Sequence, residues 1–334
     1  MPQTTLEERP IGRTNLKTSA IGLGCVTFGR EIDEDTSYAI LDYAVEKGIT
    51  FFDSAELYGG GDSQAGRKAS YGVEDQREAT TEKRSSEKII GRWLAKRRCR
   101  DRMVICTKVS SGASPENIRK QVDASLEALG IDHIDVYKIH SPDDNVPIAE
   151  SLDALNEQID AGKISVIGGS NYNAAQLREV LEIAAARGYA RFEITQPPYS
   201  LADRSFEADT LPMCAREQIA TTSYSPLGAG FLAGKYTPTN DRHHFPKGTR
   251  FDISPGHADI YFTDHNFRVI KHLRRKAGEM GVPMVRLAMA WVMSNPHITA
   301  TLVGARKENH IDNALEAFEM GLDPTFRDEM SAWD

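Results

Sequence analysis

The sequence lacks three features that would each point to a class of partner: an excess of basic charge, long apolar runs and paired cysteines. Its 334 residues include 40 Lys and Arg against 48 Asp and Glu, a formal net charge of -8. Nucleic-acid backbones are bound by clustered Lys and Arg, so we expect no nucleic-acid partner. No apolar run approaches the roughly 20 residues that span a bilayer, so we expect no membrane association.

Cysteine is scarce and scattered. Cys25, Cys99, Cys106 and Cys214 form no CxxC pair, and the opening MPQTTLEERP is polar and acidic rather than a signal peptide. We therefore expect a cytoplasmic protein with reduced thiols. Free cysteines of this kind usually pack as small buried hydrophobes.

Metal-binding and dinucleotide-binding signatures are also missing. His243, His244, His257 and His265 lie in one region but show no regular ligand spacing and have no cysteine beside them, so no metal is predicted. The stretch GLGCVTFG, residues 22–29, lacks the spacing of the GxGxxG fingerprint.

What the sequence does contain is an alternation of short apolar runs with amphipathic helical patterns. This alternation predicts a parallel sheet, and about eight repeats predict a closed (β/α)8 TIM barrel within one domain, residues 1–334. The predicted strands are Ala20–Gly24, Ile49–Asp53, Met103–Lys108, Ile134–His140, Ser165–Ser170, Phe192–Gln196, Ala220–Ser225 and Thr299–Val303. The predicted helices are Asp35–Lys47, Glu87–Lys96, Pro115–Leu129, Pro147–Asp160, Ala174–Arg187, Asp264–Glu279, Pro283–Met293 and Lys307–Glu319.

Local signals place the ends of several elements. Ser85 and Ser86 are predicted N-caps of the second helix, Ser114 caps the third, and Gly130 ends it. The segments 5–10 and 16–18 predict an N-terminal β-hairpin that closes the bottom of the barrel.

Two long irregular segments, 59–85 and 234–263, interrupt the alternation. Each follows a predicted strand, so both belong to the C-terminal face, where barrel active sites lie. Loops of this length are usually functional or disordered.

Four chemically versatile side chains stand at or just after three successive strand ends: Asp53 with Tyr58, then Lys108, then His140. A free phenol has a pKa near 10, and a nearby ammonium would lower it. A carboxylate would hold the lysine charged and in place, and a neutral imidazole would polarise a carbonyl oxygen. Together they predict a general acid site for a carbonyl that accepts hydride.

Ordinary structural roles and other barrel chemistries account less well for these four residues taken together. A lone strand-end lysine is usually a solvated charge, and a lone tyrosine is usually a packing residue. A glycosidase needs paired carboxylates at strand ends, whereas this chain has His140 and Ser225 there. A Schiff-base aldolase would need a neutral Lys108, which Asp53 would oppose.

The motifs around these residues resemble the aldo-keto reductase superfamily along nearly the whole chain. They are GITFFDSAELYG with Asp53 and Tyr58, VICTKV with Lys108, DHIDVYKIHSPD with His140, GKISVIGGSNYNAAQL, TQPPYSLADR and SYSPLGAGFLAGKY. The resemblance implies a barrel that binds NADP(H) in extended form without a Rossmann fingerprint.

The resemblance also implies the cofactor contacts. Ser170, Asn171 and Gln196 would hold the nicotinamide carboxamide, and Tyr224 would stack under the ring. Ser225, Pro226, Leu227, Gly228 and Gly230 would wrap the pyrophosphate, and Lys235 and Arg250 would help to clamp the phosphates. The remaining implied contacts are Cys25, Val26, Asp53, Gly304, Arg306, His310 and Asn313. Arg306 suits a 2′-phosphate and so favours NADPH over NADH.

The chain departs from the family pattern in two places. The family commonly has Gln at the position of His310 and a Glu-Asn pair at Asn313 and Ala314, so the adenine contacts differ. Most of 59–85 is an insertion, because relatives pass almost directly from the Tyr-Gly turn to a Ser-Glu helix start. This insertion is either a solvated loop or a lid or interface segment beside Tyr58.

The sequence therefore favours an NADPH-dependent reductase of a small aldehyde or ketone, reversible as an alcohol dehydrogenase, with Tyr58 as proton donor. The polar insertion favours a polyhydroxylated or glycosidic carbonyl. The alternative is a cofactor-sensing subunit like the channel-associated members of the superfamily, which the short N-terminal segment disfavours. Lys138 shares the inward face of His140 and needs a buried partner that the sequence does not identify. The sequence does not indicate an oligomeric state.

Overall fold

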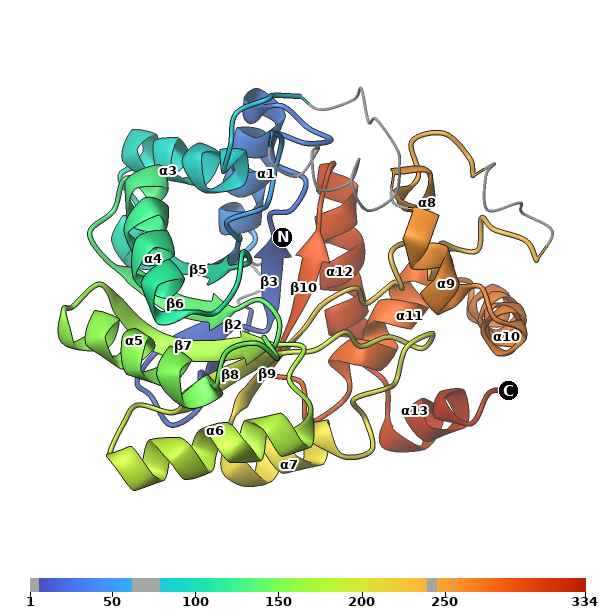
Figure 1. The fold of residues 1–334 in the computed structure, drawn as a ribbon. Coiled ribbons are helices and arrows are strands. Elements are labelled where there is room, and N and C mark those ends of the chain that lie inside the picture. The colour runs from blue at the N-terminus through green and yellow to red at the C-terminus, as the bar shows by residue number, and fades with distance from the viewer. Residues whose placement is uncertain (1–5, 62–78, 239–244, 254) are drawn as a thin grey trace.

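Eight parallel strands close into a barrel in the computed structural model, as the sequence predicts (Figure 1). The structure describes residues 6–61, 79–238, 245–253 and 255–334. The barrel order is β10-β3-β4-β5-β6-β7-β8-β9. The strands are β3 Ile21–Gly24, β4 Phe51–Asp53, β5 Val104–Val109, β6 Ile134–Ile139, β7 Ile164–Ser170, β8 Phe192–Gln196, β9 Ala220–Ser223 and β10 Ala300–Gly304.

Helices surround the barrel and connect its strands (Figure 1). The longer ones are α1 Glu34–Glu46, α3 Ser85–Arg97, α4 Pro115–Leu129, α5 Ile148–Asp160, α6 Ala174–Arg187, α10 Asp264–Met280, α11 Met284–Met293 and α12 Glu308–Met320. Outside the long segment 234–263, two further described helices were not predicted, α7 Thr210–Glu217 and α13 Pro324–Ser331, which are short and carry a proline near the first turn. Within the described ranges no helix is both long and apolar enough to cross a membrane.

The bottom of the barrel is closed by the predicted hairpin, β1 Glu8–Pro10 and β2 Lys17–Ser19. Between its strands, Ile11 is fully buried and packs with Phe51, Val104 and other inward-facing strand residues. The chain approaches the barrel so closely at Gly12 that a Cβ there would lie 2.2 Å from a Glu193 carboxylate oxygen. Apolar side chains thus fill the lower barrel, which leaves the polar inward residues at the C-terminal ends of the strands.

The predicted caps are partly right. Ser114 caps α4 by accepting from the Asn117 amide at 3.4 Å, and Gly130 ends that helix with φ 61°. The prediction for Ser85 and Ser86 is wrong, because both lie inside α3, which follows Arg84 in a left-handed conformation. Their buried hydroxyls instead make tertiary contacts.

These two serines attach the start of α3 to the upper rim of the barrel. The Ser86 hydroxyl donates to the Cys25 carbonyl at 2.9 Å and contacts the Ser54 hydroxyl at 2.8 Å. The Ser85 hydroxyl accepts from the Gly60 amide at 2.9 Å. The turn that carries Tyr58 is therefore fixed against α3 on one side and β3 on the other.

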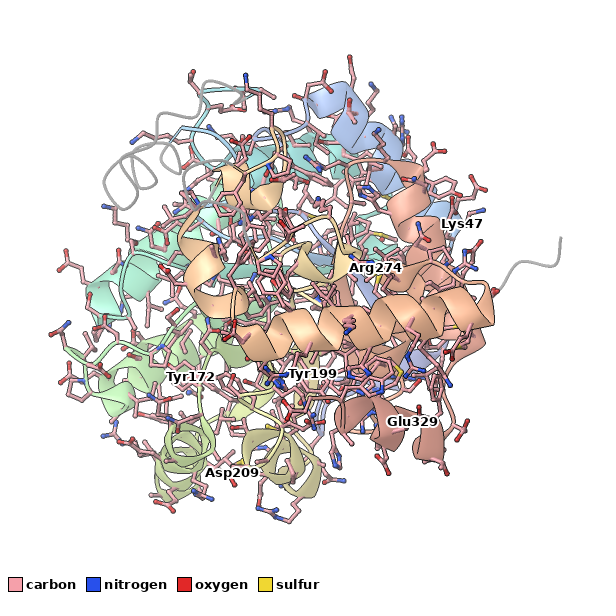
Figure 2. The ribbon with its side chains drawn as sticks, turned by 90° about the vertical axis from the view of Figure 1, so that its right-hand side faces the viewer. Lys47, Tyr172, Tyr199, Asp209, Arg274 and Glu329 are labelled. Atoms are coloured by element: carbon pink, nitrogen blue, oxygen red, sulfur yellow. The ribbon has the colours of Figure 1, made fainter. Side chains whose placement is uncertain are left out.

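The second long segment, 234–263, is more ordered than predicted, since its described part contains α8 Arg250–Ile253 and α9 Ala258–Tyr261. An aromatic cluster of Phe231, Tyr236, Phe245, Phe251, Tyr261 and Phe262 packs this segment. Figure 2 shows α10 lying across this side of the molecule, with Arg274 on it and Tyr199 beneath it. The Arg274 guanidinium donates to the Gly234 carbonyl at 2.8 Å, which ties the start of the segment to α10.

Candidate active site

The centre of the upper barrel is a buried ion pair between β4 and β5. Asp53 follows Phe51 on the inward face of β4, and Lys108 ends the inward series of Val104 and Cys106 on β5. The Lys108 Nζ donates to Asp53 Oδ1 and to the Ser54 carbonyl, both at 2.6 Å. The lysine and aspartate side chains are 0% and 2% exposed, so the pair is shielded from water.

Both members of this pair are charged at neutral pH. Burial would raise the pKa of Asp53, but the charges of Lys108 and Lys138 outweigh it and hold that pKa below its usual value. Burial would lower the pKa of Lys108, but the Asp53 charge raises it above its usual value. This agrees with the role predicted for the carboxylate, which is to keep the lysine charged and in place.

Tyr58 lies above this pair. Its ring centroid is 4.9 Å from the Lys108 Nζ and 5.6 Å from the His140 ring, which meets it edge-on. Burial raises the pKa of Tyr58 and outweighs the opposing charge of Lys108. The net direction is opposite to the predicted lowering. The phenol is therefore protonated at neutral pH.

His140 is held as a neutral imidazole. Burial, followed by the positive charge of Lys108, lowers the pKa of His140 to about 3. The Ser110 hydroxyl contacts its Nδ1 at 2.6 Å, and the Ser110 amide donates to the buried Glu56 carboxylate at 2.9 Å. When the hydroxyl donates to Nδ1, the proton of the imidazole is on Nε2.

Ser110 and Lys138 are site residues that sequence reasoning left without a role or a partner. Ser110 stands two residues after Lys108, so strand alternation alone places it on the same face as the lysine. The partners of Lys138 come from strands distant in sequence. Its Nζ lies 3.5 Å from Asp53 Oδ2, and it donates to Gln196 Oε1 at 2.7 Å and to the Thr222 hydroxyl at 3.3 Å.

The residues predicted to hold a nicotinamide carboxamide meet at the ends of β7, β8 and β9. The Ser170 hydroxyl donates to the Gln196 carbonyl at 2.8 Å. The Asn171 Nδ2 donates to the His140 carbonyl at 3.0 Å, and the Tyr224 hydroxyl donates to Asn171 Oδ1 at 2.9 Å. These bonds fix which side of the Asn171 amide faces each neighbour.

The backbone beyond β9 makes a turn in which several residues have left-handed φ angles. Ser225, Gly228, Ala229 and Gly230 have φ angles of 54°, 55°, 55° and 88°. Within the turn, the Gly228 amide donates to the Ser225 carbonyl at 2.8 Å and the Gly230 amide donates to the Leu227 carbonyl at 3.0 Å. Pro226 is buried beneath this turn, and Leu227 packs against the core.

Beside this turn, the ends of β3 and β10 leave open space. Gly24 pairs with Gly304, and a Cβ added at Gly304 would have no other atom within 4 Å. Cys25 follows, buried, with its amide donating to the Asp53 carbonyl at 2.9 Å, and Val26 is partly exposed. Gly304 is exposed, so a ligand could approach the backbone closely at this position.

Basic groups gather at the end of this path. The Arg306 amide donates to His310 Nδ1 at 3.3 Å. Burial and then the charge of Arg306 lower the pKa values of both Lys235 and His310. Among the carboxylates in the described part of the chain, none forms an ion pair with Lys235 or Arg306. This local positive charge in an acidic protein suits a phosphate group.

Two predicted contacts have other partners. Arg250 lies 3.5 Å from the Glu31 carboxylate, and its charge acts on the pKa of Tyr58. It is therefore near the mouth of the barrel. The Asn313 amide donates to the Asn309 carbonyl of its own helix at 2.7 Å.

Parts of two predictions lie outside the described residues. They are positions 62–78, which make up most of the proposed lid, and His243 and His244 of the histidine-rich region.

A closed parallel barrel with this arrangement of Asp, Tyr, Lys and His defines a class of protein, and comparison with known proteins gives the same class. The model of the aldo/keto reductase family matches residues 20–334, so the chain belongs to this family. It is an NAD(P)H-dependent aldo-keto reductase, an oxidoreductase of carbonyl compounds.

Individual relatives are similar along most of their length. The uncharacterized oxidoreductase YrpG of Bacillus subtilis is 31% identical, over 95% of this chain and 93% of its own. A probable voltage-gated potassium channel subunit beta of Oryza sativa is 30% identical, over 94% and 92%. The aldo-keto reductase yakc [NADP(+)] of Schizosaccharomyces pombe is 27% identical, over 99% and 92%.

Proposed function

We propose that this chain reduces an aldehyde or ketone to the alcohol with NADPH, and that Tyr58 supplies the proton. The observation that carries this proposal is the order of groups at the barrel mouth. A protonated phenol stands over a buried ammonium, and a neutral imidazole meets the phenol edge-on. These groups come from β5, β6 and the turn after β4, which the barrel holds rigidly.

The chain's own residues do the proton chemistry. When bound, the cofactor supplies the hydride that the carbonyl carbon accepts. Tyr58 protonates the carbonyl oxygen, and Lys108 stabilises the phenolate that remains. Asp53 keeps Lys108 charged. When the Ser110 hydroxyl donates to His140 Nδ1, the proton of the neutral imidazole is on Nε2, from which His140 donates a hydrogen bond to the carbonyl oxygen.

The residues that surround the barrel mouth fit a nicotinamide dinucleotide. Ser170, Asn171 and Gln196 offer amide and hydroxyl groups for a carboxamide, and Tyr224 offers an aromatic face. In the turn 225–230, Gly228 and Gly230 have left-handed φ angles and no side chain, so a pyrophosphate could approach the backbone closely there. Lys235 and Arg306 offer positive charge for the 2′-phosphate that distinguishes NADPH from NADH.

For the substrate, we propose a polar carbonyl compound such as a polyhydroxylated or glycosidic one. The support is the sequence of the insertion after Tyr58, which is rich in charged and polar residues. We expect such substrates to have a higher kcat/KM than apolar aldehydes and ketones of equal size. Equal values for the two groups would refute this choice of substrate.

The test of the cofactor and reaction type is titration of the purified chain with NADPH and NADH, followed by turnover on a panel of aldehydes, ketones and keto-sugars. We expect NADPH to bind at least ten-fold more tightly than NADH and to be oxidised when a panel member is present. Failure to bind either nucleotide would overturn the proposal.

A second candidate is a cofactor-sensing subunit with little turnover. The observation in its favour is the 30% identity to a probable channel subunit beta over 94% of this chain. Tight nucleotide binding without turnover of any panel member would favour this candidate over the reductase.

A further inference from the structure

Lys138 is a second buried ammonium in the site, and the proposed mechanism does not use it. It is 0% exposed and stands on β6 directly opposite Lys108 on β5. Like charges opposite one another on neighbouring strands are destabilising, and a buried charge is costly unless it is paired. Lys138 is therefore expected to lower the stability of the fold, and packing alone gives no reason for a lysine at this position.

The contacts of Lys138 join Asp53 to Gln196. Its Nζ lies 3.5 Å from Asp53 Oδ2 and donates to Gln196 Oε1 at 2.7 Å. The Gln196 Nε2 in turn donates to Asp53 Oδ1 at 3.3 Å. With these bonds made, Gln196 can still offer a ligand the second hydrogen on Nε2 and the second lone pair on Oε1.

The charges at the centre do not balance. Among the described residues, Asp53 is the one carboxylate paired with the ammonium groups of Lys108 and Lys138. The His140 imidazole is neutral, since its pKa is about 3, and burial raises the pKa of Tyr58. Burial also raises the pKa values of the buried thiols nearby, so they are neutral. The buried Glu56 carboxylate is bonded to the Ser110 amide instead, so two lysine ammonium groups share one ion-paired carboxylate in a region shielded from water.

We propose that Lys138 is a positioning residue that orients the Gln196 amide and makes the site bind the reduced cofactor more tightly than the oxidised one. The inference rests on the proposed use of a nicotinamide cofactor with Gln196 at its carboxamide. The reduced ring is neutral, whereas the oxidised ring carries a positive charge that Lys138 repels, because Lys138 shares its one ion-paired carboxylate with Lys108. Such repulsion is strongest where water is excluded.

The test uses isothermal calorimetry on the full chain with three ligands: NADPH, NADP+ and adenosine 2′,5′-bisphosphate, which has no nicotinamide. In the wild type we expect NADP+ to bind on the order of ten-fold more weakly than NADPH. In Lys138→Met the ratio of the two dissociation constants falls toward one, and both nucleotides lose affinity relative to the bisphosphate because Gln196 is no longer held. The matched variant Lys138→Arg keeps the charge and so keeps the ratio.

Lys138→Gln is a second neutral variant, in case Lys138→Met does not fold. A wild-type ratio at or below one overturns the inference without any variant. So does an unchanged ratio in the neutral variants, or a parallel weakening of all three ligands, which is what a purely structural lysine would give. If neither nucleotide binds the wild type, the proposed function fails as well. If both bind but the ratio does not respond, this inference alone fails.

Discussion

Asp53 holds the two buried ammonium groups together, so its charge is a stability determinant as well as part of the site. We predict that Asp53→Asn destabilises the fold by about 3–5 kcal/mol, because it leaves buried lysines without a counter-charge. Asp123→Asn is the matched control, since Asp123 forms an exposed pair with Lys163. There the expected loss is under about 1 kcal/mol. Urea unfolding of both variants measures this, and equal losses would contradict the account.

The neutral state of His140 makes stability depend on pH. Its folded pKa is about 3, well below its usual value. The unfolded chain therefore binds a proton that the folded chain does not between about pH 6.5 and pH 3, so stability is lost as the pH falls through that window. The depressed pKa of Asp53 acts in the same direction, but only below about pH 4.

We predict that the wild type loses about 2 kcal/mol more stability between pH 7.5 and pH 5 than His140→Gln does. All other titrations in this range are common to the two proteins and cancel. Unfolding free energies at the two pH values test the prediction. Identical pH dependence would show that His140 is not held neutral by the fold.

The hairpin and the candidate active site are at opposite ends of the barrel. A substitution in the hairpin is therefore expected to lower stability without lowering kcat. We predict that Ile11→Ala costs about 2–5 kcal/mol, because it opens a cavity among the lower strand residues. The value of kcat should stay within about two-fold of the wild type under conditions where the variant is folded, since the upper barrel is untouched. Lys17→Ala, on an exposed hairpin position, serves as control. Loss of kcat without loss of stability would contradict this division.

The regular elements were predictable because local patterns determine them. β8, α4 and α6 match their predicted bounds, and the other barrel strands differ by at most two residues at either end. Ser85 and Ser86 were misread because a hydroxyl before a helical pattern can cap the helix or contact another element. Which it does depends on the strand packed beside it.

The proximity of the four candidate site residues was predictable from the sequence, and their electrostatics less so. Asp53, Tyr58, Lys108 and His140 meet as their strand-end positions indicated. The pKa of Tyr58 shifts upward because burial, which depends on the whole fold, outweighs one nearby charge. The partners of Lys138 come from strands that are 58 and 84 residues away in sequence.

The molecule as a whole is acidic, with a net charge of -8, yet positive charge is concentrated along the proposed cofactor path. We predict that Arg306→Ala weakens NADPH binding by about ten- to a hundred-fold, because it removes the proposed charged contact to the 2′-phosphate. NADH binding should change less than about three-fold. Arg268→Ala, which removes an exposed arginine paired with Asp334, is the control.

Calorimetry at two salt concentrations would test this further, since added salt should weaken NADPH binding more in the wild type than in Arg306→Ala. Equal weakening of NADPH and NADH by Arg306→Ala would mean that Arg306 does not contact the 2′-phosphate.

The most direct measurement of the central claim is a comparison of Tyr58→Phe with the wild type for NADPH affinity and for kcat. The phenylalanine keeps the ring that meets His140 and removes the hydroxyl. The account predicts an NADPH dissociation constant within about three-fold of the wild type and a kcat lower by about a hundred- to ten-thousand-fold. A Tyr58→Phe enzyme that retains wild-type turnover with a carbonyl substrate would show that another group supplies the proton.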